Sequence, residues 1–129
     1  MASALEQAKV LLDIANSALN TTLSYLKAQT LVNGKVSTEK LDDHQLAGYE
    51  ASYCAAELSA ASVMLDYHAQ ISGQKGEANA KTEELITLQF AAETLQNCRT
   101  RFSARRADFG LDRAALATTV DSDDVDAFI

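Results

Sequence analysis

The sequence predicts an all-α protein: an up-down-up bundle of three long antiparallel helices with a short fourth helix and an acidic C-terminal tail. The 129-residue chain contains no proline, so nothing forces a break inside a helix. Alanine and leucine are abundant and aromatic residues make up only 6%, a composition typical of helices rather than sheets. Apolar residues also recur at spacings of three and four over long segments, as they do along one face of a helix.

The first helix is expected from about Ser3 to Leu31. Apolar or small residues follow an alternating three-four spacing through this segment, at Leu5, Ala8, Leu12, Ala15, Leu19, Thr22 and Leu26. Such a stripe predicts a helix with one buried face. Asn33 and Gly34 come next and indicate a turn, because glycine tolerates the left-handed conformation that ends many helices.

The second helix is expected from Ser37, its N-cap, to Ile71. Its main stripe is made by Leu46, Tyr49, Tyr53, Ala56, Ala60, Val63, Tyr67 and Ile71. The other faces are largely apolar too, and a helix that is apolar all round is usually buried. We therefore expect this helix at the centre of the bundle, least exposed of all, with its tyrosine rings facing inward.

A break over residues 72–76 separates this helix from a third one, expected from about Glu77 to Arg106. Its inward positions are predicted to be Leu85, Leu88, Ala92, Leu95 and Phe102. Gly110 then ends the bundle domain, assigned to residues 1–110. Residues 111–129 are expected to form a short helix and a solvated acidic tail, because acidic and small residues dominate there.

Charge and cysteine content limit the environment and the partners. A net charge of −7 disfavours nucleic acid and anionic membranes, which need basic patches. The basic residues Arg99, Arg101, Arg105 and Arg106 either complement the dipole of a helix end or contact an anion or a partner. No segment reaches transmembrane length or has the pattern of a secretory signal, so we expect a cytoplasmic protein. Cys54 and Cys98 are expected to be buried thiols, with their redox state left open.

The sequence predicts no catalytic, cofactor-binding or metal-binding residue. A di-iron or di-manganese bundle needs Glu-x-x-His on two helices, and no Glu in this chain has His three residues later. Gly73 and Gly76 lack the lysine and the strand-to-helix context of a phosphate-binding loop. Neither cysteine has a nearby base along the chain to activate it.

The segment His44-Gln45-Leu46-Ala47-Gly48 is similar to the histidine phosphotransfer signature, in which Lys follows the histidine by three positions and Gly by four. Gly48 matches, whereas Ala47 replaces the lysine that would steady a phosphoryl group. Two interpretations stay open: a structural histidine in the first turns of a helix, or a degenerate phosphotransfer site.

Polar groups accompany the tyrosines of the second helix, since Glu50 and Glu57 lie beside Tyr49 and Tyr53. A tyrosine hydroxyl on a buried face needs a hydrogen-bond partner. These rings either belong to the core and reach a carboxylate at its rim, or form a polar network at a docking surface.

Several of these motifs together resemble a known family. They are Leu41-Asp42-x-His44-Gln45-Leu46-x-x-Tyr49-Glu50, Ala55-Ala56-Glu57-Leu58, Phe90-Ala91-Ala92-Glu93-x-Leu95 with Arg99, and Asp108-Phe109-Gly110-Leu111. This chain is similar over residues 40–111 to the N-terminal helical extension of acyl-CoA dehydrogenases of the methylsuccinyl-CoA dehydrogenase-like subgroup. Residues 124–129 also look like the opening helix of the catalytic core of such an enzyme.

The resemblance implies a helical domain that packs on an FAD-dependent acyl-CoA dehydrogenase core, in the same polypeptide or in a separate subunit. No catalytic or FAD-binding residue of the family is present to carry over. The implied docking residues are His44, Gln45, Tyr49, Glu50, Tyr53, Glu57 and Arg99. The alternative is a separate interaction bundle, such as an adaptor, a phasin-like coat protein or an oligomerisation module that forms homo-oligomers.

Overall fold

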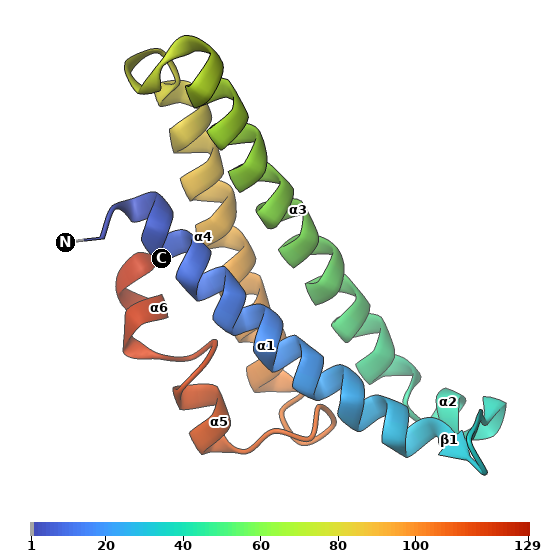
Figure 1. Ribbon diagram of the computed structural model, residues 1–129. Coiled ribbons are helices and arrows are strands. Elements are labelled where there is room, and N and C mark those ends of the chain that lie inside the picture. The colour runs from blue at the N-terminus through green and yellow to red at the C-terminus, as the bar shows by residue number, and fades with distance from the viewer. Residues whose placement is uncertain (1) are drawn as a thin grey trace.

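The computed structural model describes residues 2–129 and confirms the all-α bundle. Three long helices pack against one another in antiparallel, up-down-up order (Figure 1). Shorter helices flank them at the first connection and at the C-terminal end. The long helices are α1 (Ala4–Thr30), α3 (Gln45–Lys75) and α4 (Lys81–Ala104), and the short ones α2 (Thr38–Asp43), α5 (Arg113–Ala117) and α6 (Asp123–Phe128).

Helix α1 begins at a capping box. The Ser3 hydroxyl accepts a hydrogen bond from the backbone N–H of Glu6, and the Glu6 carboxylate accepts one from the backbone N–H of Ser3. This reciprocal pair satisfies donors that a helix start otherwise leaves without partners. The predicted stripe is confirmed, with Leu5 half-buried and the other members buried. Leu11 and Ala18 widen it, because α1 packs against both α3 and α4.

The connection from α1 to α3 is more structured than expected. Strands β1 (Leu31–Val32) and β2 (Lys35–Val36) form a two-residue antiparallel ladder around Asn33 and Gly34. Both turn residues have positive φ, 53° and 78°, as the tight turns of β-hairpins require. The Ser37 hydroxyl then caps α2 by accepting from the backbone N–H of Lys40.

The predicted continuous helix over residues 37–71 is wrong at one point. His44 has φ −111° and ψ 18°, outside helical geometry, and ends α2 just before α3 begins at Gln45. The second break occurs near its predicted place, where Gly76 has φ 85° and a 3₁₀ turn, η1 (Glu77–Asn79), precedes α4. Helix α4 therefore starts at Lys81, four residues after its expected beginning.

The core lies between the three long helices and is centred on α1 rather than on α3. Nine residues of α1 are buried but only six of the longer α3. The prediction that the second helix would be least exposed is therefore wrong. One side of α3 packs on α1 and α4, and the other side faces away from both. The largest fully buried side chains of the core include Leu12, Leu58, Leu95, Phe102 and Phe109.

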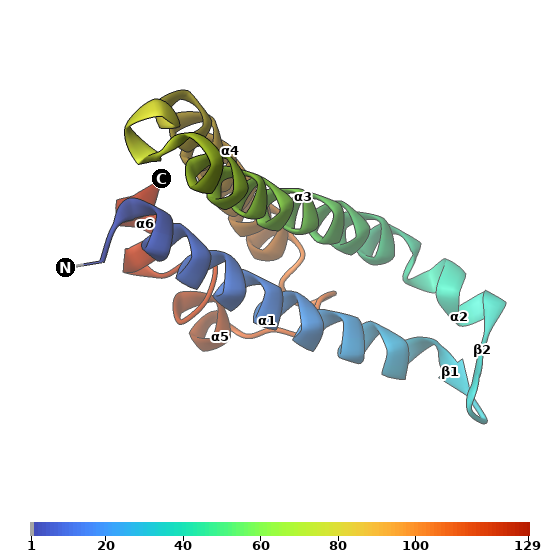
Figure 2. The ribbon, with the colours of Figure 1, turned by 45° about the horizontal axis from the view of Figure 1, so that its top comes forward.

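The C-terminal segment packs into the same core. Phe109 stacks edge-to-face on Phe102 at 5.1 Å between ring centroids, and Gly110 reverses the chain with φ 70°. Val120 and Val125 are buried, and α6 contacts α1. Figure 2 shows α5 on the side of α1 away from α3 and α6 beside the first turns of α1. The expectation of a solvated end is wrong for these residues, because their valines supply apolar surface to the core.

Candidate docking surface

Helix α3 carries two parallel apolar stripes with the same three-four spacing. The first stripe is buried and consists of small or medium side chains, at Ala47, Ala51, Cys54, Leu58, Ala61 and His68, with the half-buried Leu65 between the last two. The second stripe is exposed along its whole length and contains the bulkier rings. We call this second stripe the α3 seam; it consists of Leu46, Tyr49, Tyr53, Ala56, Ala60, Val63 and Tyr67.

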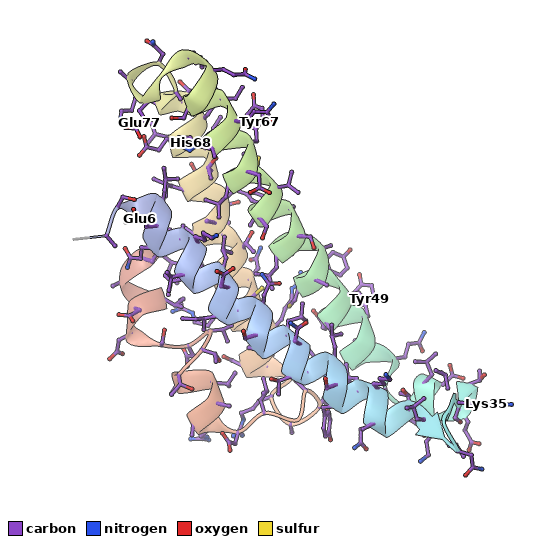
Figure 3. All side chains as sticks on the ribbon, viewed as in Figure 1. Glu6, Lys35, Tyr49, Tyr67, His68 and Glu77 are labelled. Carbon is purple, nitrogen blue, oxygen red and sulfur yellow. The ribbon has the colours of Figure 1, made fainter. Side chains whose placement is uncertain are left out.

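The α3 seam corrects the predicted orientation of the tyrosines. Tyr49, Tyr53 and Tyr67 are 57%, 45% and 46% exposed, not inward-facing. Figure 3 labels Tyr49 and Tyr67 on the side of α3 turned away from α1. Close packing against two helices favours alanine and cysteine on the buried side, which leaves the larger rings outside. Leu85 of α4 was also expected inward and is exposed.

The tyrosines at one end of the seam contact each other and a cation. The rings of Tyr49 and Tyr53 lie 4.9 Å apart in a tilted arrangement. A hydrogen bond with Tyr53 raises the pKa of the Tyr49 hydroxyl above its ordinary value. The Arg101 guanidinium carbon from α4 lies 4.5 Å from the centroid of the Tyr53 ring, within the range of a cation–π contact.

Arg101 also joins two carboxylates of α3 into one network. Its guanidinium lies 3.1 Å from a Glu50 oxygen and 3.5 Å from a Glu57 oxygen. The side-chain amide of Asn97 donates a hydrogen bond to Glu57, at 2.9 Å. We call these residues with Tyr53 the Arg101 cluster. It fixes α3 against α4 along one edge of the α3 seam and compensates part of the acidic charge there.

The structure therefore brings together only part of the residues that the sequence singled out. Glu50, Tyr53 and Glu57 meet in the Arg101 cluster, and Tyr49 lies beside it. Gln45 is exposed at the first position of α3, and His44 is the residue between α2 and α3. The remaining candidate, Arg99, pairs with Asp126 of α6 at 3.0 Å.

Sequence reasoning overlooked the roles of Arg101 and Asn97. Helices α3 and α4 are antiparallel neighbours joined by a short connection, so residues equally far from that connection face each other. Glu57 and Asn97 satisfy this condition approximately, as do Glu50 and Arg101. The signal was present in the sequence once the connection near Gly76 had been located.

The two cysteines face each other across α3 and α4. Both are fully buried and neither forms a disulfide. A hydrogen bond with Cys54, followed by burial, raises the pKa of the Cys98 thiol. The thiol of Cys98 is thus held in its protonated form, which is a weak nucleophile.

A groove of about 960 Å³ lies between the N-terminal half of α1 and the C-terminal half of α3. Figure 3 labels three of its lining residues, Glu6, His68 and Glu77. Within residues 2–129, no three His, Cys, Asp or Glu side chains are placed to hold a metal ion. Both apolar side chains and carboxylates line the groove. Besides the labelled residues, the lining includes Leu5, Lys9, Leu12, Asp13, Leu65 and Asp66.

Comparisons of this chain with protein-family models, with curated proteins and with solved structures find no match. Among the helices that the structure describes, none combines the length and apolarity needed to cross a membrane.

Proposed function

We propose that this chain is a non-catalytic helical interaction domain that binds a protein partner through the α3 seam. The exposed seam is the observation that carries this proposal. Exposed apolar residues scattered singly are ordinary, but a contiguous apolar strip bordered by polar groups is typical of a binding surface. The seam has seven positions without a charge, and the Arg101 cluster borders it.

The composition of the seam supports the proposal. Tyrosine contributes large and rigid contact area with a polar tip, and it is enriched at the energetically important positions of protein interfaces. Three tyrosines occupy the seam, and two of them lie at opposite ends of it. Contact with Arg101 and Tyr49 orients the Tyr53 ring, so less side-chain entropy is lost when a partner binds.

The sequence resemblance suggests which enzyme the domain would pack on, an FAD-dependent acyl-CoA dehydrogenase. Its support is the set of motifs that share residues with the seam and the Arg101 cluster, including Leu46, Tyr49, Glu50 and Glu57. In this form of the proposal, FAD and the acyl-CoA bind to the dehydrogenase core. This chain contributes no reacting group.

The test is affinity capture with a variant that makes the seam polar. We expect the immobilised wild-type chain to retain, from an extract of its source cells, an FAD-containing protein that reduces a dye when an acyl-CoA is added. The variant Tyr49→Ser/Tyr67→Ser should lose this activity. The matched control Val10→Ser/Leu23→Ser removes two exposed apolar side chains of α1 and should retain it.

Two results would count against the proposal in different ways. A flavin-free eluate without acyl-CoA-dependent dye reduction would refute the dehydrogenase role. Equal retention of every partner by the wild type and the seam variant would refute the seam as the binding surface.

A further inference from the structure

The order of residues along the α3 seam is close to a palindrome. When the helix is reversed about Leu58, Ala56 exchanges with Ala60, Tyr53 with Val63, and Tyr49 with Tyr67. Each exchange places an alanine opposite an alanine or a large side chain opposite a large one. A twofold-symmetric contact between identical subunits requires such self-complementarity.

Side-chain size along the seam suits two helices that cross. Packed helices cross at about 20° or about 50°, so they approach most closely at one point and diverge toward their ends. The exposed alanines, Ala56 and Ala60, lie at the middle of the seam, whereas Tyr49 and Tyr67 lie near its ends. Small residues permit the close approach, and large rings fill the widening space on either side.

We propose that a second copy of this chain covers the α3 seam, with the two α3 helices antiparallel and crossing at Ala56 and Ala60. This inference rests on the proposed function, because it names the occupant of the same surface. Tyr49 of each copy then packs on Tyr67 of the other, and Leu46 packs on the stem of Gln70. In the dehydrogenase form of the proposal, the seam would join two enzyme subunits.

The available area is sufficient for a specific dimer. The seam spans 22 residues, from Leu46 to Tyr67, or roughly 32 Å along the helix. An aromatic side chain covers ~150–250 Å² and about half of each seam tyrosine is exposed, so the three rings offer about 300 Å² per chain. With Leu46 and Val63 added, a symmetric pair buries on the order of 1,000 Å² in total, which is near the smallest area that specific protein interfaces bury.

The charges beside the seam are compatible with self-association. Glu57 lies next to the crossing point and would approach its counterpart in the other copy, which by itself is repulsive. Arg101 and Asn97 already bind this carboxylate, so part of its charge is compensated. Since each copy carries a net charge of −7, added salt should strengthen the dimer by screening repulsion.

Sedimentation equilibrium of the purified chain over a range of concentrations tests this arrangement. We expect a monomer–dimer equilibrium, and we expect Ala60→Glu to raise the dissociation constant by about 100-fold or more, because an unpaired carboxylate would be buried at the crossing point. The matched control Ala28→Glu changes an exposed alanine of α1 and should leave the equilibrium unchanged. Circular dichroism checks that both variants are folded, and Tyr49→Ser/Tyr67→Ser provides a second way to disrupt the seam.

Cysteine cross-linking tests the antiparallel direction. A disulfide should form between a chain carrying Ala56→Cys and a chain carrying Ala60→Cys when the two are mixed. Efficient self-linking of Ala56→Cys alone would indicate a parallel pair and overturn the inference.

A wild-type chain that stays monomeric at all concentrations, or a dimer that survives Ala60→Glu, would also overturn it. The proposed function would still stand in that case, provided that the seam variant loses a partner that the wild type captures.

Discussion

Replacing Gly110 by alanine should destabilise the fold through two separable effects. Gly110 has φ 70°, a left-handed conformation that costs a residue with a Cβ atom about 1–2 kcal/mol. A Cβ atom at this position would also lie 2.4 Å from Cγ of the Tyr25 ring. The ring would have to move, and overpacking of this kind costs about 1–3 kcal/mol. We therefore expect Gly110→Ala to lower the free energy of unfolding by about 2–5 kcal/mol.

Gly34 provides the matched control for this prediction. It has a similar φ of 78°, but a Cβ atom there meets nothing within 4 Å. Gly34→Ala should therefore show only the conformational part, about 1–2 kcal/mol. Urea unfolding followed by far-UV circular dichroism measures both values. If the two variants lose the same stability, the proposed contact with Tyr25 is wrong. In a Tyr25→Ala background, Gly110→Ala should cost only the conformational part, because the ring that the Cβ atom would meet is gone.

Further predictions concern the buried polar groups and the ion pairs. The hydrogen bond between the two cysteines raises the pKa of the Cys98 thiol and lowers that of the Cys54 thiol. The folded pair therefore keeps one more proton than the unfolded chain once the pH rises above about 8.5. Stability should then fall by up to about 1.4 kcal/mol per pH unit, and Cys54→Ala/Cys98→Ala should weaken this fall in urea titrations at pH 7–10; equal pH profiles would refute the assignment. Arg101→Met should cost about 1–2 kcal/mol because several contacts are lost, whereas Arg99→Met, whose partner is exposed, should cost under about 0.5 kcal/mol in the same assay. The buried hydroxyl of Thr22 has no hydrogen-bond partner, so Thr22→Val should raise the melting temperature by removing a desolvation penalty of about 1 kcal/mol. Thr30→Val, which removes a hydroxyl that donates to a backbone carbonyl, should not raise it.

The three long helices could be predicted from the sequence because the spacing of their apolar residues and the glycines that separate them were clear. The α1 stripe and the turns at Gly34 and Gly76 illustrate this. The orientation of α3 could not be predicted in the same way. Its two apolar stripes have equal period, so spacing alone does not identify the buried one. Only the close packing of α3 on α1 and α4 selects the stripe with small residues such as Ala51.

The candidate site was likewise predictable only in part. Glu50, Tyr53 and Glu57 were identified by their shared stretch of α3. Their partner Arg101 differs from the expected Arg99 by two positions, and that difference turns the side chain to another face of α4. The pairing of Arg99 depends on where α6 folds back, and the short acidic run around Asp124 predicted a solvated end instead.

The return of α6 onto α1 places the start and the end of the described chain side by side. Ala4 and Phe128 line the same small surface depression, and Figure 1 places the two ends together at one side of the bundle. Such an arrangement suits circular permutation: a short linker could join the ends, and new ends could open at the exposed hairpin turn around Asn33. It also means that a fluorescent tag fused at either end would sit away from the tyrosine side of α3.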